Sequence, residues 1–265
     1  MVEIKSAKAF RGVRTLPFCY LCGTTFKDAD KVTKDHVPPK AIFSKDDRKN
    51  PLILMVHDVC NQKESRTDEV IGQLISVLHG KYPKPSKQRI KVTVENIPDR
   101  TQPTLVLRDM NMQIVLARWV KGFHAALYRE YLPNDTKNAF CPPLPEGRVV
   151  RGKLEFNPVP IHHPVIVETI KKNRRAGRLD EIVCYNGKCK YECAWERMDD
   201  NTWGCFFALN IYDWKNLGDP ANFPRRGCVG WYGPESGKPE NATDGVTRIL
   251  GIPIANRDRF DAFDD

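Results

Sequence analysis

Two short pairs of metal-binding side chains stand out in the first quarter of the sequence. Cys19 and Cys22 form a C-x2-C turn followed by Gly23, and His57 and Cys60 form an H-x2-C turn after 34 intervening residues. Each pair can wrap one tight turn and point two ligand atoms at a common centre, and Gly23 permits the open backbone that such a turn needs. The alternative is two chance pairs packed as small hydrophobic residues. We expect one structural Zn²⁺ bound by all four side chains, with no open position for chemistry.

Polar residues with catalytic potential lie between and just after these pairs. Asp35 and His36 precede the dipeptide of two prolines in DHVPP, and Asn61 directly follows Cys60. A neutral imidazole with a pKa of about 6.5 is a suitable general base at neutral pH, and Asp and Asn oxygens suit a hard ion such as Mg²⁺. Taken singly, an Asp-His pair is ordinary solvated surface, and Asn61 is a helix N-cap. Their fixed offsets within one zinc knuckle favour the functional interpretation.

The order C-x2-C, DHVPP and H-x2-C-N-x-K resembles the HNH nucleases, or ββα-metal finger family, in the zinc-bearing form typified by recombination endonuclease VII. The resemblance covers about residues 16–80. It implies that His36 is the general base that activates a water, and that Asp35 and Asn61 hold a catalytic Mg²⁺ or Mn²⁺ ion. It also implies the structural zinc site, with His57 where the family usually has Cys. Asn50 is the candidate for the middle position of the HNH name.

Basic side chains are concentrated in the middle of the chain. The formal net charge is +9 with a pI of about 9.1, and residues 81–178 hold 19 basic and 8 acidic side chains. Such a segment is typical of proteins that bind a polyanion, although a basic pI also occurs in proteins that bind no nucleic acid. A basic block near residue 173 binds phosphates or is simply a solvated helix end. The residues expected to contact nucleic acid are Lys40, Lys63, Arg66, Lys171, Lys172, Arg174 and Arg175.

Three further cysteines, Cys184, Cys189 and Cys193, form a C-x4-C-x3-C pattern without a clear fourth ligand. Buried strand cysteines are favoured here over a second zinc site. The sequence shows no secretion signal and no apolar run long enough to span a membrane, so its nine cysteines indicate free thiols or metal ligands in a reducing compartment. We expect a cytoplasmic protein with no membrane partner.

Hydrophobic periodicity predicts the elements that position these residues. Apolar residues at helical spacing predict helices over about 61–78 and 113–131. Alternation predicts a strand at 90–94 that pairs with 105–107, and a hairpin of 190–197 with 203–211, while the Gly- and Pro-rich stretch 218–243 is expected to form loops.

The predicted fold class is α+β, in three segments. Residues 1–80 are expected to form the zinc-bearing ββα-metal (HNH) nuclease module, residues 81–178 a basic α+β region for substrate binding, and residues 179–265 a β-rich, acidic region. The sequence thus predicts a metal-dependent HNH endonuclease that hydrolyses phosphodiester bonds in DNA, and a symmetric homodimer would suit cutting of both strands. Two alternatives stay open. One is a non-catalytic zinc finger that binds nucleic acid or a protein partner, and the other is an HNH nuclease directed at RNA.

Overall fold

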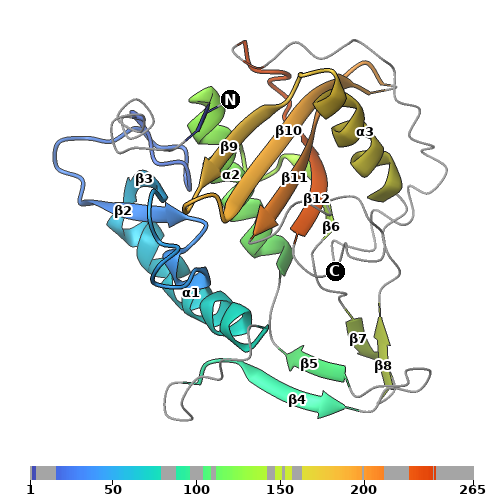
Figure 1. Ribbon diagram of the computed structural model, residues 1–265. Helices are drawn as coiled ribbons and strands as arrows, with labels where there is room; N and C mark the ends of the chain where they lie inside the picture. The colour runs from blue at the N-terminus through green and yellow to red at the C-terminus, as the bar shows by residue number, and fades with distance from the viewer. Residues whose placement is uncertain are drawn as a thin grey trace.

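The computed structural model describes residues 2–3, 16–78, 88–95, 104–108, 112–141, 147–150, 153–156, 163–198, 200–211, 227–240 and 242. Within these residues the chain is a mixed α+β protein with three α-helices and a β-rich C-terminal part, so the predicted fold class is confirmed at this level (Figure 1). None of the helices in the described part of the chain has the length and apolar character needed to cross a bilayer.

A hairpin followed at once by a helix forms the N-terminal part of the structure. Strands β2 (Val32–Val37) and β3 (Leu52–His57) are antiparallel, and helix α1 (Asp58–Leu78) begins at the residue after β3. Alternate residues of β3, namely Leu52, Leu54 and Val56, are fully buried, as expected for a strand with one face on the core. A short 3-10 helix, η1 (Lys40–Ile42), lies in the connection between the strands.

Six strands form the main sheet, in the order β1-β9-β10-β11-β12-β6. Their bounds are Val2–Glu3 (β1), Asp180–Cys184 (β9), Cys189–Arg197 (β10), Trp203–Ile211 (β11), Gly227–Gly233 (β12) and Lys137–Cys141 (β6). The predicted hairpin is confirmed, with Lys190 opposite Asn210. The expectation of loops over 218–243 is wrong at β12. Gly230 lies within that strand, and the Phe207 ring occupies the space beside it, since a Cβ added at Gly230 would lie only 2.7 Å from the ring.

Two helices cover opposite faces of this sheet (Figure 1). On one face, α2 (Met112–Tyr128) stacks Phe123 on Tyr191 at 4.6 Å between ring centroids. On the other, α3 (His163–Arg175) packs Ile166 and Ile170 in a cluster that includes Phe206. The helix predicted over 113–131 is confirmed but ends three residues earlier, because Arg129 adopts a left-handed φ of 59°.

Helix α2 also packs on the N-terminal hairpin, so the two parts share one core. An added Cβ on Gly122 would lie 2.7 Å from Val37 of β2, which shows how closely the helix approaches that strand. The main core cluster runs from Leu16 to Ala242 and draws on all three predicted segments. The predicted boundary at residue 80 lies outside the described residues.

Two small hairpins complete the described part of the chain. Strands β4 (Lys91–Glu95) and β5 (Thr104–Arg108) pair antiparallel, as predicted, with Val92 opposite Leu107. Strands β7 (Gly147–Val150) and β8 (Lys153–Phe156) form the second hairpin, which was not among the predicted elements.

Candidate functional site

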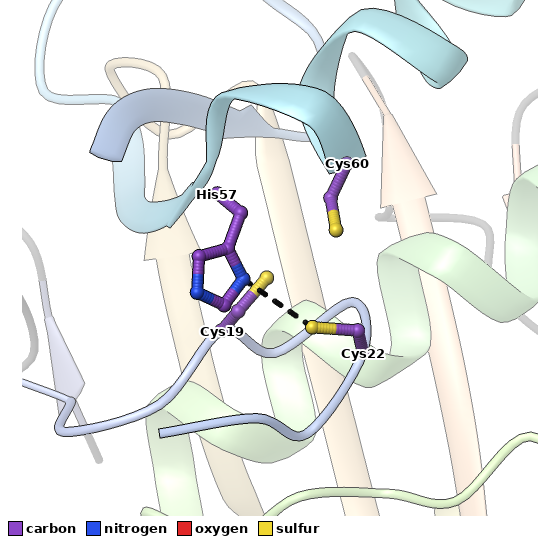
Figure 2. A group of neighbouring side chains, drawn as sticks. All are labelled: Cys19, Cys22, His57 and Cys60. Carbon is purple, nitrogen blue, oxygen red and sulfur yellow. Dashed lines mark hydrogen bonds between the residues drawn. The ribbon is translucent and has the colours of Figure 1, made fainter. Parts of the chain in front are cut away.

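The four predicted zinc ligands meet at the base of the N-terminal hairpin (Figure 2). Cys19 and Cys22 lie on the turn before β2, His57 ends β3, and Cys60 lies in the first turn of α1. Their ligand atoms all lie within 4.8 Å of one another, and Cys22 Sγ is 3.4 Å from His57 Nδ1. Tetrahedral Zn²⁺ would separate a sulfur and a nitrogen ligand by about 3.6 Å. The donor set and its spacing therefore fit a metal ion such as zinc.

The first ligand turn is closed by its own backbone. Gly23 N–H donates to Cys19 O at 2.8 Å, and Cys19 N–H donates to Thr24 O at 3.0 Å. Gly23 has a φ of +78°, and the Tyr131 ring packs against it so closely that an added Cβ would lie 2.7 Å from Cε1. The open backbone expected of Gly23 is therefore present, and the space beside it is filled.

The thiols of the cluster differ in their acidity. Burial alone would raise the pKa of Cys22, but hydrogen bonds from Thr24 and His57 lower it to about 6. Burial and the charge of Cys19 raise the pKa of Cys60 to about 12, and burial also raises that of Cys19. Cys22 is thus the thiol most readily ionised, and a bound cation would have to displace protons from the other two.

Sequence reasoning missed one member of this centre, Asp30. Its Oδ2 lies 3.1 Å from His57 Nε2 and accepts the Lys27 N–H at 2.8 Å. A carboxylate on the far nitrogen of a ligating histidine fixes the orientation of the ring and leaves Nδ1 for the metal. No spacing rule links Asp30 to His57, because the β2–β3 register, with Val32 opposite His57, brings them together.

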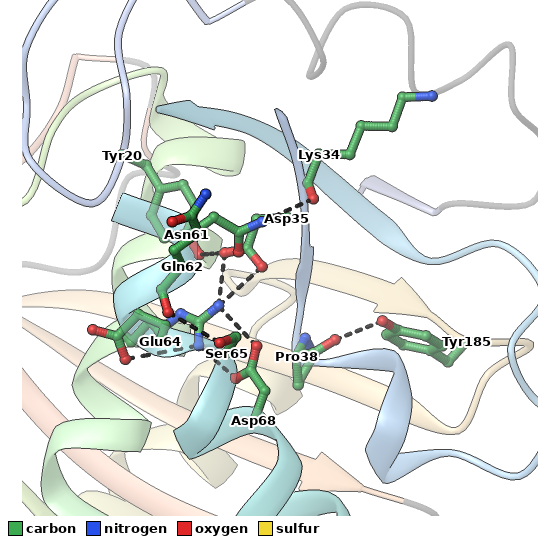
Figure 3. A network of polar contacts seen from close by, with 11 residues as sticks. Tyr20, Lys34, Asp35, Pro38, Asn61, Gln62, Glu64, Ser65, Asp68 and Tyr185 are labelled. Carbon is green, nitrogen blue, oxygen red and sulfur yellow. Dashed lines mark hydrogen bonds and ion pairs between the residues drawn. The ribbon is translucent and has the colours of Figure 1, made fainter. Parts of the chain in front are cut away.

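The predicted catalytic residues lie around strand β2 and the start of α1. Asp35 and His36 are neighbours on β2 and so face opposite sides of the hairpin. Asn61 is not the N-cap, since α1 begins three residues earlier at Asp58, and its side-chain Nδ2 donates to Lys34 O at 3.5 Å (Figure 3). The helix thus brings the Asn61 amide against the strand that carries Asp35 and His36.

His36 and Asp35 have different surroundings. His36 is partly exposed, and its pKa is lowered by burial and then by the positive charge of Lys40, so the imidazole is neutral at neutral pH. Asp35 is buried, and its carboxylate accepts hydrogen bonds from Tyr20 and Arg118. Sequence reasoning missed both donors. Arg118 lies on α2, outside the 16–80 window in which the motif can be read.

Asn50, the candidate for the middle position, has a structural place in the hairpin connection. It adopts a left-handed φ of 53°, a conformation that asparagine tolerates well. Its carbonyl accepts the Tyr185 N–H at 3.0 Å, and the Tyr185 hydroxyl donates to Pro38 O at 2.5 Å. The β9–β10 turn therefore holds the connection that follows Asp35 and His36.

The residues predicted to contact nucleic acid fall into two groups. Lys40, Lys63 and Arg66 are exposed, on η1 and along α1. On α3, by contrast, Arg174 Nη2 lies 2.6 Å from Glu192 and Lys172 Nζ lies 3.4 Å from Glu196, two fully buried carboxylates of β10. Lys171 pairs with Glu168 on the surface of the same helix, and Arg175 is exposed. Two of these four basic side chains, Lys172 and Arg174, therefore hold α3 on the sheet.

The cysteines of the C-x4-C-x3-C pattern are buried in the main sheet. Cys184 lies opposite Cys189 across β9 and β10. Cys193 Sγ and Tyr128 Oη share a hydrogen bond at 3.1 Å. Within the described ranges, the N-terminal cluster is the only group of side chains arranged to hold a metal. The favoured interpretation, buried strand cysteines, agrees with these positions.

Comparisons with protein-family models, curated proteins and solved structures found no match to this chain.

Proposed function

We propose that the protein is a metal-dependent HNH endonuclease that hydrolyses phosphodiester bonds in DNA. The observation that carries the proposal is the strand–strand–helix unit β2-β3-α1, with a four-ligand metal cluster at its base and Asn61 held against the strand of Asp35 and His36. A zinc finger that only binds a partner has no need of these three residues at those positions. The closed donor set gives the zinc a structural role.

His36 is the general base of the proposed reaction. Its neutral, partly exposed imidazole takes a proton from water as the water oxygen attacks phosphorus and the bond to the departing sugar oxygen breaks. The oxygens of Asp35 and Asn61 would hold a Mg²⁺ or Mn²⁺ ion, which supplies charge stabilisation at the phosphate when bound. Lys40, Lys63 and Arg66 are exposed around this unit and suited to contact the nucleic-acid backbone.

A cleavage assay with a metal series tests the proposal. Zinc-loaded protein is incubated with duplex, branched and single-stranded DNA and with RNA, in Mg²⁺, Mn²⁺, Ca²⁺ or EDTA. We expect cutting of DNA with Mg²⁺ or Mn²⁺ and none in EDTA. Cutting confined to RNA would support the RNA-directed alternative instead. Binding of DNA without cutting under any ion would support the non-catalytic zinc finger and refute the proposal.

A further inference from the structure

Two donors from outside β2 and β3 enclose the carboxylate of Asp35. The side chain is 4% exposed, Tyr20 Oη donates to Oδ2 at 2.5 Å, and Arg118 Nη2 lies 2.9 Å from both oxygens. Tyr20 belongs to the zinc turn, and Arg118 lies on α2, 83 residues further along the chain. The orientation of Asp35 is therefore fixed by contacts that the strand–strand–helix unit alone does not provide.

Arg118 is itself held by two carboxylates of α1. Its Nη1 donates to Asp68 Oδ1 at 2.5 Å and lies 3.9 Å from Glu64 Oε2. The Arg118 side chain is 6% exposed, and its Nε has no partner among the described residues, so the terminal nitrogens make its polar contacts. Figure 3 shows Asp35, Glu64 and Asp68 converging between β2 and α1. One cation thus serves three carboxylates, which leaves the group a formal charge of −2.

This arrangement suits a carboxylate that must also bind a metal ion. An ionised carboxylate offers about four acceptor positions, and Tyr20 and Arg118 make three contacts with Asp35. One position on Oδ1 therefore remains for a cation. The residual negative charge favours a cation there, and Asn61 turns its amide nitrogen to Lys34 O, which makes its oxygen the atom available to a metal. Hydrogen bonds of this kind commonly orient ligating carboxylates.

We propose that Tyr20 and Arg118 are positioning residues that hold Asp35 in the orientation required of a ligand to the divalent ion. This inference rests on the proposed function. It makes α2 part of the active unit, since a chain that ended with α1 would lack the Arg118 contacts.

A matched pair of tyrosine variants tests the inference. Tyr20→Phe removes only the hydroxyl that donates to Asp35. Tyr232→Phe removes an equally buried hydroxyl, which lies 3.0 Å from His124 Nδ1 in the main core. Both variants lose one buried hydrogen bond, and only the first loses a bond to the Asp35 carboxylate. Arg118→Lys keeps the charge but cannot bridge Asp35 and Asp68 through two nitrogens, so it serves as an independent second variant.

Mn²⁺ binding to the zinc-loaded protein, measured by electron paramagnetic resonance of free Mn²⁺, is the readout. We expect Tyr20→Phe and Arg118→Lys to weaken Mn²⁺ binding by about 10- to 100-fold, and Tyr232→Phe to bind as the wild type does. Asp35→Asn is measured alongside and should abolish binding. If it does, unchanged or tighter binding in Tyr20→Phe and Arg118→Lys would overturn the inference and leave the proposed function standing. If Asp35→Asn binds Mn²⁺ like the wild type, both the inference and the proposed function fail.

Discussion

At the scale of single residues, the four candidate metal ligands could be predicted from the sequence, but Asp30, the hydrogen-bond partner of His57, could not. The types and spacing of Cys19, Cys22, His57 and Cys60 were enough to predict the metal cluster, because two-ligand turns are local in sequence. The partner of His57 was not predictable in this way. Asp30 reaches the ring only through the register of β2 with β3, which local patterns do not specify.

Asp30 should therefore matter for metal affinity. In Asp30→Asn, the His57 ring loses its carboxylate partner, and we expect zinc to bind about 10- to 100-fold more weakly. Competition against a chromogenic chelator measures the affinity. Asp28→Asn, an exposed carboxylate in the same loop, is the control and should retain wild-type affinity. Equal affinities of the two variants would show that Asp30 does not support the ligand.

At the scale of elements, hydrophobic periodicity predicted the helices and strands whose own residues carry the pattern. It missed strand β12, whose residues pair with neighbouring strands without such a pattern. The two longer helices and the β10–β11 hairpin follow from their own apolar patterns. The glycines of β12 are typical of turns and therefore predict a loop. Gly230 instead lies within a strand, where Phe207 and Phe140 from neighbouring strands pack against it, and a local pattern does not specify such contacts. The basic residues of α3 likewise carry no sign in their own sequence of Glu192 and Glu196, the buried β10 carboxylates that pair with two of them.

The pairing of α3 with β10 leads to a prediction about stability. Arg174→Ala leaves the buried Glu192 with Lys190 as its remaining cation, and we expect a loss of about 1–2 kcal/mol in the free energy of unfolding. Urea denaturation measures the difference. Arg175→Ala, the same change one residue later at an exposed position, should stay within about 0.5 kcal/mol of the wild type. A larger loss in Arg175→Ala than in Arg174→Ala would contradict this role.

On the scale of the whole molecule, one hydrophobic core joins residues of all three predicted segments. Helix α2 lies in the predicted middle segment, yet it contacts β2 through Gly122 and the main sheet through Phe123. Charge and composition divide the chain by sequence position. They carry no information on which faces pack together, so the shared core could not be anticipated from them.

His124 in this shared core makes the stability of the whole protein sensitive to acid. It is 2% exposed, contacts Tyr232 Oη at 3.0 Å, and burial lowers its pKa to about 3. Between pH 6.5 and 3 the unfolded chain takes up a proton at this residue that the folded chain does not, so stability falls as the pH falls.

The slope of unfolding free energy against pH measures this effect. The contribution of His124 approaches about 1.4 kcal/mol per pH unit, and His124→Gln should remove it. The comparison uses the slopes rather than the absolute stabilities, because the substitution also alters packing. Identical slopes for wild type and His124→Gln across this range would exclude His124 as the acid-sensitive group.

If the strand–strand–helix unit is catalytic, as we propose, the His36→Ala variant should lose DNA cleavage. Cleavage of supercoiled plasmid in Mg²⁺ or Mn²⁺ is compared for wild type and variant, each with its zinc content measured. We predict a rate lower by about 100- to 10,000-fold with zinc content unchanged, because His36 is the proposed base and is not one of the four clustered metal ligands. A His36→Ala protein that cuts as fast as the wild type would show that His36 is not the base and that the proposed mechanism is wrong.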